Sequence, residues 1–370
     1  MTHIQKRIEA LRQTLKKNKL DGFLIFSVEG SDAANLRYLT GFGGSFGVLI
    51  VSEDRQIFFT DSRYIERVRN DLRGFEVEEL NARKERASQK AVKILKALKL
   101  KRVGFNSLTI SVAVHNDLNK RLKGKGMKLV PLDGVVEKLR RIKDEQEISN
   151  IARAVELTDQ AYAHILNQIK VGMTESEVAW ELEKFIRENG SDGLAFPIIV
   201  ASGPNSALPH HSVSDRKIQR GDFLLFDFAA RYNGYCADMT RTVVVGQPSE
   251  EQQKIYKIVL EAQERAIEKI RAGIKGKDAD KAARGVIEQA GYGENFGHGT
   301  GHGIGLAVHE GPRLSALLSQ DKLKPGMVVT VEPGIYLPNW GGVRIEDLVV
   351  VEEDRCRVLT RSPKRELQVI

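Results

Sequence analysis

Two aspartates lie on a predicted β-hairpin, where they could bind a cation. The hairpin consists of FLLFDFAARY and YCADMTRTVVV, which flank Asn233-Gly234, a strong turn signal. In this register Asp227 faces Thr240, and Asp238 points to the same face, about 7–8 Å from Asp227 at the backbone. A solvent-facing pair is one interpretation. However, Asp227 interrupts an apolar run, where an unpaired charge is costly and a bound metal would remove that cost.

A second predicted hairpin, near the end of the chain, repeats this pattern. Glu332 ends VVTVE, just before a Pro-Gly pair, and Glu346 lies in VRIED. Arg344 and Glu346 are two residues apart, so they share one face of their strand. The sequence therefore offers two carboxylates from each hairpin.

Histidines gather near the same segments. His298, His302 and His309 lie within twelve residues, and His210 and His211 precede the first hairpin. Glycines around the first three would let the backbone approach a ligand closely. Four carboxylates and an imidazole can hold two divalent ions about 3.5–4 Å apart, bridged by carboxylates and a water. This ligand set suits manganese, cobalt, iron or zinc, but not copper(I).

Two other motifs do not lead to a site. GGSFG (43–47) matches the GxSxG pattern of serine hydrolases, but a predicted strand follows it where that pattern requires a helix. FGHGTGHGIGL lacks the GK[ST] of a phosphate-binding loop, and its glycines do not fit GxGxxG. We therefore expect a Gly-rich loop at 43–47 and no nucleotide site.

Taken together, the motifs resemble those of the prolidase (Xaa-Pro dipeptidase) and aminopeptidase P family of metallopeptidases. HGTGHGIGLAVHE (298–310) is similar to the family signature, and LLFDFAA, CADMTRT, TVEPG and VRIED occur in the family's order. NSALPHH resembles its upstream histidine segment, and NLRYLTGF and FTDSRY resemble its N-terminal domain. The resemblance implies an α/β fold class: a small N-terminal α/β domain of the creatinase type, then a C-terminal α+β pita-bread catalytic domain with two similar halves.

The resemblance also implies a site for two divalent metal ions per subunit, manganese or cobalt first and zinc or iron as alternatives. The implied ligands are Asp227, Asp238, His302, Glu332 and Glu346, with Asp238 and Glu346 bridging both ions. The implied activity is hydrolysis of the bond before proline by a water that bridges the two metals.

The family's other functional residues have matching positions here. Glu332 corresponds to the group that handles the proton of the attacking water, and His309 to a histidine that contacts the substrate near the scissile bond. His210 corresponds to a histidine that helps to stabilise the tetrahedral intermediate. Arg344 corresponds to an arginine bonded around the metal-bridging carboxylates. His298 is expected to support the ligands without binding metal.

Four further residues are interpreted individually. We expect His211 on the surface and Cys236 as a small buried residue. Thr240, opposite Asp227, could donate a hydrogen bond to a ligand carboxylate. Arg313 lies four residues beyond His309, where it could bind the free carboxylate of a dipeptide.

This reading of Arg313 favours a dipeptidase, with an Xaa-Pro aminopeptidase acting on longer peptides as the alternative. Some proteins with this fold bind protein or RNA and have lost metal ligands, whereas here all five ligand positions are occupied. The resemblance also implies a homodimer.

Composition is typical of a two-domain globular protein. The chain has 370 residues, of which 41% are hydrophobic and 29% charged. It contains no apolar run of about 18 residues and no signal-peptide core, and two cysteines cannot form a disulfide framework. We therefore expect a cytoplasmic protein without a membrane partner, with domains at 1–134 and 135–370.

Local patterns predict most elements. In the first domain, strands are predicted at 21–27, 46–52, 56–61, 75–80, 101–106 and 128–133, and helices at 4–19 and 83–99. In the second, 137–170 predicts one long helix. Capping boxes at Thr174 and Ser249 open further helices, and another runs from about 278 to Gly291. With the two hairpins, the order helix, helix, hairpin occurs twice.

The segment 81–128 holds 14 basic and 2 acidic residues, which could attract nucleic acid. Lysines spaced three apart in AVKILKALKLKR indicate a solvated helix face instead, and no aromatic residue lies between 83 and 102 to stack on bases. We therefore predict weak nucleic-acid binding that is lost at moderate salt, measured by fluorescence anisotropy. Sequence-preferring binding at physiological salt would contradict this.

Overall fold

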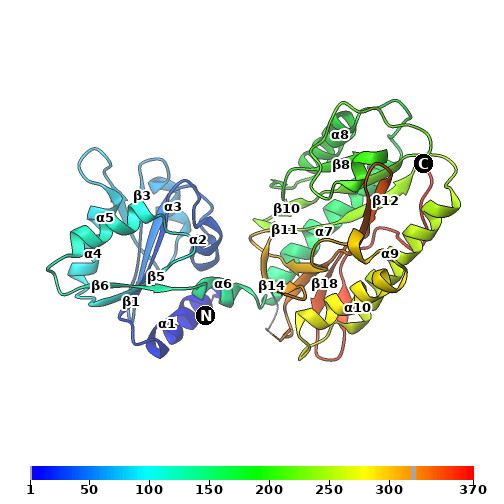
Figure 1. The fold of residues 1–370 in the computed structure, drawn as a ribbon. Helices are drawn as coiled ribbons and strands as arrows, with labels where there is room; N and C mark the ends of the chain where they lie inside the picture. Colours follow the sequence, from blue (N-terminus) through cyan, green and yellow to red (C-terminus); the bar gives the residue numbers. More distant parts are fainter. Residues whose placement is uncertain (1, 318–321) are drawn as a thin grey trace. The chain divides into compact units, whose positions relative to one another are not determined.

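A computed structural model describes residues 2–317 and 322–370, and the chain divides into two compact units, Met1–Arg140 and Arg141–Ile370 (Figure 1). Helix α6 (Val135–Arg140) belongs to the first unit. Its Glu137 accepts hydrogen bonds from Asn35 (2.8 Å) and Asn106 (2.6 Å), and its Arg140 donates to Asn35 (2.7 Å). The boundary between the two units therefore lies at Arg140, six residues after the boundary at Gly134 that we predict from the sequence.

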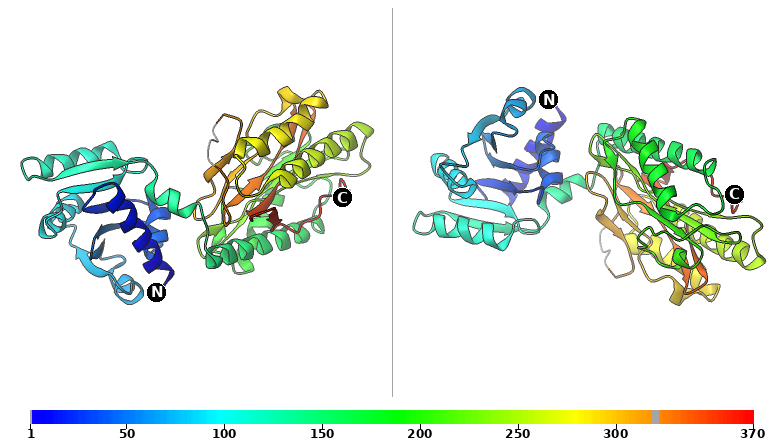
Figure 2. Two further views of the ribbon diagram at one scale, coloured as in Figure 1. Left: turned by 90° about the horizontal axis from the view of Figure 1, so that it is seen from below. Right: turned by 90° about the horizontal axis from the view of Figure 1, so that it is seen from above.

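The first unit is a six-stranded mixed sheet covered by helices (Figure 2). The strand order is β4-β3-β2-β1-β5-β6, and the strands are β1 (Gly22–Ser27), β2 (Gly47–Ser52), β3 (Gln56–Asp61), β4 (Glu76–Leu80), β5 (Arg102–Asn106) and β6 (Lys128–Leu132). The helices before α6 are α1 (His3–Lys17), α2 (Ala33–Thr40), α3 (Ile65–Asp71), α4 (Ala87–Ala97) and α5 (Val112–Leu122). All six predicted strands are confirmed, whereas α2, α3 and α5 were not predicted. The 43–47 motif precedes β2, so it lacks the helix of a nucleophile elbow.

The second unit contains the predicted repeat. Its first half comprises α7 (Glu145–Leu166), α8 (Glu175–Glu188), β7 (Gly193–Leu194), β8 (Ile199–Ser202), the 3-10 turn η1 (Gly203–Ala207), β9 (Phe223–Asp227), β10 (Ala230–Tyr232), β11 (Tyr235–Cys236) and β12 (Thr240–Val244). Its second half comprises α9 (Glu250–Lys269), α10 (Gly276–Gln289), η2 (Gly293–Asn295), β13 (Gly301–Gly303), β14 (Glu310–Leu314), β15 (Val328–Val331), β16 (Gly334–Leu337), β17 (Gly341–Arg344), β18 (Asp347–Val351) and β19 (Cys356–Val358). Each half is two helices followed by hairpin strands.

The prediction of one helix over 137–170 is wrong, because the chain leaves the helix between α6 and α7. Ile142 pairs with Met327 as an extended bridge. Asp144 then caps α7: its side chain accepts from the Glu147 N–H (2.9 Å), and the Glu147 carboxylate accepts from the Asp144 N–H (3.1 Å). This capping box starts a new helix inside a continuous apolar periodicity.

Both hairpins are interrupted at their carboxylates. The first keeps the predicted register, with Thr240 opposite Asp227, but Asp227 ends β9 and Asp238 lies between β11 and β12. In the second, Glu332 separates β15 from β16, and Glu346 separates β17 from β18. At these breaks the strands pass from one sheet to another, so all four carboxylates lie where two sheets meet.

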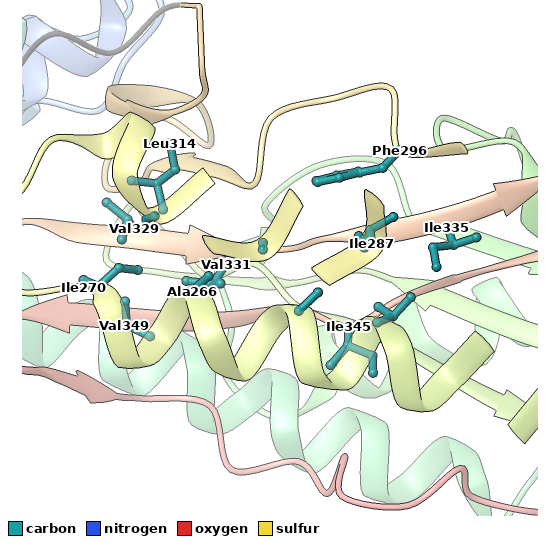
Figure 3. Close-up of a cluster of buried hydrophobic side chains, with 14 of the residues drawn as sticks. Ala266, Ile270, Ile287, Phe296, Leu314, Val329, Val331, Ile335, Ile345 and Val349 are labelled. Carbon is teal, nitrogen blue, oxygen red and sulfur yellow. The ribbon is translucent and has the colours of Figure 1, made fainter. Parts of the chain in front are cut away.

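A hydrophobic cluster supports the second hairpin from the side of α9 and α10 (Figure 3). Ala266 of α9, Ile270, which directly follows α9, and Ile287 of α10 pack with Val331 and Ile345. These last two residues directly precede Glu332 and Glu346. Burial of each such aliphatic side chain stabilises the fold by about 1.5–3 kcal/mol. On the other side, residues of α7 pack against β15 and β18, so these strands are held between two helical layers.

Within the described ranges, none of the helices is both long and apolar enough to cross a membrane.

Candidate metal centre

Three carboxylates from the two hairpins converge on one point. One oxygen atom each from Asp227, Asp238 and Glu346 lies within 4.8 Å of the other two. Asp238 and Glu346 are only 5% and 2% exposed, and Asp227 is half-buried. Two carboxylates of the first hairpin thus meet one of the second, as a shared metal would require.

His302 and Glu332 complete the group. The His302 Nε2 atom lies 3.7 Å from an Asp238 oxygen and 3.3 Å from a Glu332 oxygen. The His302 Nδ1 atom must donate to the Gly303 carbonyl (3.1 Å), because a carbonyl can only accept. This bond fixes the ring tautomer that leaves the Nε2 lone pair directed at the carboxylates, as in metal-binding histidines.

Electrostatics show the cost of this arrangement without a cation. Burial raises the pKa of Asp238 well above its ordinary value, and the charges of Glu346 and Asp227 raise it further. Burial likewise raises the pKa of Glu346 and, to a smaller extent, that of Glu332. For His302 burial acts in the opposite direction and lowers the pKa to about 4, so its imidazole stays neutral and able to bind metal.

Arg344 is the buried cation that pairs with this group. Its guanidinium donates to an Asp227 oxygen (2.5 Å) and to the hydroxyls of Tyr336 (3.0 Å) and Thr240 (3.0 Å). Thr240 in turn donates to Glu346 (2.7 Å). The family resemblance implies that Arg344 lies around the bridging carboxylates. In the structure it bonds Asp227 directly and reaches Glu346 through Thr240.

His298 supports the centre through Tyr336, which the sequence analysis did not identify. The His298 Nδ1 atom donates to the Gly299 carbonyl (2.8 Å), so its Nε2 atom accepts from the Tyr336 hydroxyl (2.8 Å). Tyr336 thus links His298 to Arg344. In the register of β16 and β17, Tyr336 pairs with Gly342, two residues from Arg344, so Tyr336 and Arg344 lie on the same face of the hairpin.

The residues present fit divalent metal ions. Arg344 satisfies one oxygen of Asp227, but the buried Oδ1 atom accepts no hydrogen bond from the described residues. Such an oxygen is costly unless a cation binds it. Four carboxylates against one guanidinium leave an excess of negative charge. The hard oxygens and a single imidazole nitrogen are the ligands that manganese, cobalt, iron and zinc accept.

Comparison with known proteins decides the family. Residues 149–353 match metallopeptidase family M24, and residues 7–142 match the creatinase/prolidase N-terminal domain. The chain belongs to metallopeptidase family M24. It is 38% identical over 370 residues to an Xaa-Pro dipeptidase of Pyrococcus horikoshii. The alignment covers 99% of this chain and 100% of the relative.

Two solved structures are similar to this M24 chain over nearly its whole length. The Xaa-Pro dipeptidase from Bacillus anthracis has a TM-score of 0.93 and 42% identity, with 99% of this chain and 100% of that chain covered. The X-Pro aminopeptidase from Thermotoga maritima has a TM-score of 0.91 and 41% identity, with 98% and 99% covered. The M24 family implies divalent metal ions, and the carboxylate group provides the place for them.

Three exposed basic side chains, His309, Arg313 and His210, lie near His302 or near one another. The rings of His302 and His309 are 4.3 Å apart, and Arg313 pairs with His302 across β13 and β14. Burial lowers the pKa of His309, and the nearby basic side chains of His302, Arg313 and His210 lower it further. The structure therefore brings His309 and Arg313 next to the expected ligand His302, and His210 close enough to His309 to affect its pKa.

Two other expectations have different outcomes. The prediction of a surface position for His211 is wrong, because its side chain is only 9% exposed and its Nε2 atom lies 2.8 Å from a Glu175 oxygen. Cys236 is buried among apolar residues such as Ile304, as expected for a small core side chain.

Removing one carboxylate from the M24 centre should stabilise the metal-free protein. For chelated protein at neutral pH we expect Asp238→Asn to raise the thermal midpoint by about 2 °C or more, because it relieves repulsion with Glu346 and Asp227. The gain should shrink as the pH falls, since a folded-state carboxylate with a raised pKa takes up its own proton. Added manganese should stabilise the variant less than the unchanged protein.

Calorimetry with and without chelator measures both effects. Asp354→Asn, at an exposed carboxylate of the second unit, serves as the control. A lower midpoint for chelated Asp238→Asn than for the chelated unchanged protein would show that the carboxylates do not repel one another.

Proposed function

We propose that this M24 chain hydrolyses the Xaa-Pro bond of dipeptides with two divalent metal ions. The group of buried carboxylates from both hairpins, arranged beside His302 Nε2, carries the proposal. The Pyrococcus horikoshii and Bacillus anthracis relatives, both described as Xaa-Pro dipeptidases, support the substrate class. The reading as a non-catalytic binding protein is disfavoured, because all five expected ligand positions are occupied.

The ions would be held by Asp227, Asp238, His302, Glu332 and Glu346. When bound, they would lower the pKa of a water and polarise the substrate carbonyl. Manganese or cobalt is the metal that we propose. The homodimer and the cytoplasmic location remain predictions from the sequence.

Glu332 is proposed to move the proton of the attacking water. Burial raises its pKa, which favours a carboxylate that takes up a proton and then releases it to the leaving group. Thr330 donates to its Oε1 atom (3.1 Å) and also accepts from the backbone N–H of His302 (3.0 Å), so one hydroxyl ties the Glu332 side chain to the His302 main chain. The leaving group is the proline nitrogen, which must gain a proton as the C–N bond breaks.

His309 and His210 are proposed to act on the substrate side. The lowered pKa of His309 keeps its imidazole neutral, so that one ring N–H can donate to the peptide near the scissile bond. His210, exposed and close enough to influence His309, would donate to the oxyanion as it forms. Arg313 would bind the carboxylate that follows proline in a dipeptide.

A second candidate is Xaa-Pro aminopeptidase activity on longer peptides. The likeness to the Thermotoga maritima X-Pro aminopeptidase favours it. A panel of Xaa-Pro dipeptides and Xaa-Pro-Yaa tripeptides, assayed with metal content measured in parallel, distinguishes the two. We expect faster cleavage of the dipeptides and no activity after complete chelation. Full activity of metal-stripped protein would refute the proposed chemistry.

Glu332→Gln tests the proton acceptor. The amide keeps the shape but loses the charge and the basic oxygen, so we expect turnover to fall by at least about 100-fold. Steady-state kinetics at saturating metal, with the bound metal quantified, measure this. Near-normal turnover with both metals bound would assign the proton to another group.

Arg313→Ala tests the preference for dipeptides. Loss of a charge-assisted bond should raise KM for Xaa-Pro dipeptides about 10-fold, with a much smaller effect on tripeptides, which have no carboxylate at that position. Arg265→Ala, at an exposed arginine of α9, is the matched control. Equal effects on both substrate classes would remove the argument for a dipeptidase.

A further inference from the structure

The segment that carries His210 has little regular structure of its own. After η1 ends at Ala207, no helix or strand begins until β9 at Phe223, and Lys217 forms only an isolated bridge with Thr174. The His210 side chain is exposed and makes no hydrogen bond to the described residues. Its position beside His309 must therefore be set by the residues around it in the chain.

One buried carboxylate accepts hydrogen bonds from those neighbours. Glu175, the first residue of α8, has a fully buried side chain. Its Oε1 atom accepts from the Ser202 N–H (2.7 Å), the Ser202 hydroxyl (2.7 Å) and the Asn205 amide (2.9 Å). Its Oε2 atom accepts from His211 Nε2 (2.8 Å), the Ser214 N–H (3.1 Å) and the Ser214 hydroxyl (2.6 Å). The donors lie on both sides of His210.

The His211 bond is the one nearest to the functional side chain. Because a carboxylate can only accept, the His211 Nε2 atom carries the proton that it donates to Glu175. Burial alone would raise the pKa of Glu175, but hydrogen bonds from Ser214, His211 and others lower it to about 2, so the group stays charged. Such charge-assisted bonds are roughly twice as strong as neutral ones.

Further contacts hold the two ends of the 203–222 loop, which runs from the start of η1 to β9. Arg216 donates to Asp222 (2.6 Å) and to the Ser202 hydroxyl (2.6 Å). The Ser206 hydroxyl accepts from the Gly342 N–H (2.8 Å), which ties the loop to the second hairpin. Gly203 adopts a φ of 49°, and a Cβ there would lie 2.5 Å from an Asp222 oxygen, so only glycine fits. These contacts fix where the loop starts and ends, and Glu175 fixes its middle.

We propose that Glu175, acting through His211, is a positioning residue that holds His210 against the substrate face of the metal centre. It neither binds metal nor touches substrate. The inference rests on the proposed function only where it assigns His210 a role in the reaction. It also gives His211, which the sequence analysis left without a role, a structural reason to follow His210.

A double-mutant cycle tests the proposal. Glu175→Gln, His210→Ala and the double variant are compared on an Xaa-Pro dipeptide at saturating manganese. We expect Glu175→Gln to lower kcat by about 10-fold or more with little change in KM, since misplacement of a transition-state donor affects turnover. In the His210→Ala background, Glu175→Gln should lower kcat by less than about 2-fold, because the imidazole that Glu175 positions is already absent. Equal losses in both backgrounds would show a purely structural role and overturn the proposal.

Two controls separate positioning from general damage. Asp21→Asn removes a carboxylate that accepts from two backbone N–H groups in the first unit (2.8 and 2.7 Å), and it should leave kcat unchanged. If Glu175→Gln does not fold, His211→Gln takes its place in the cycle, with the same expected coupling to His210. Bound metal should be the same in every variant.

Hydrogen–deuterium exchange provides a readout without substrate. In Glu175→Gln the amides of 203–217 should exchange at least about 10-fold faster, while those of β9 and β12 keep their protection. Unchanged exchange in this segment would overturn the positioning role even if kinetics changed. If the unchanged protein cleaves no Xaa-Pro substrate, the proposed function fails, and the exchange result still decides whether Glu175 orders the loop.

Discussion

Mutual repulsion among buried carboxylates is the constraint on which the second unit depends. Asp238 and Glu346 come from different hairpins, yet their oxygens lie within 4.8 Å of a third carboxylate and are almost fully buried. An unpaired buried charge is costly, so this arrangement requires both a rigid support and a compensating cation. The hydrophobic layers on either side of β15 and β18 provide the support. Arg344 provides part of the positive charge, and divalent ions would provide the rest.

A second buried ion pair joins the two hairpins behind the ligands. The guanidinium of Arg241, in β12, donates to the Glu346 carbonyl (2.5 Å) and to the Asp347 carboxylate (2.7 Å), and both side chains of this pair are 1% exposed. Desolvation offsets much of the attraction in such a pair, so its contribution lies more in specificity than in net stability. It fixes β12 against β18 at the place where Glu346 must face Asp238.

The proposed substrate side follows a different rule, because exposed side chains cannot be held by burial. His210 and His309 are both exposed, and each is followed by a residue with a buried partner. His211 lies against Glu175, and Glu310 lies 3.8 Å from Lys143, with both of these side chains nearly inaccessible. The chain thus anchors the neighbour of each histidine and leaves the imidazole itself exposed, as the proposed roles of His210 and His309 require.

The sequence by itself determined the features that depend on residues close together in the chain. The Asn233-Gly234 turn sets the register that places Thr240 opposite Asp227, and capping boxes start the helices where polar and acidic residues predict them. Only the tertiary structure decided contacts between distant segments: Arg344 with Asp227 across 117 residues, and His211 with Glu175 across 36. Continuous hydrophobic periodicity over 137–170 gave no sign of the break between α6 and α7. In the structure, Ile142 pairs with Met327 at this break. Turns and caps act through local geometry, whereas burial, ring tautomer and charge pairing depend on which surfaces the fold brings together and on the exclusion of water there.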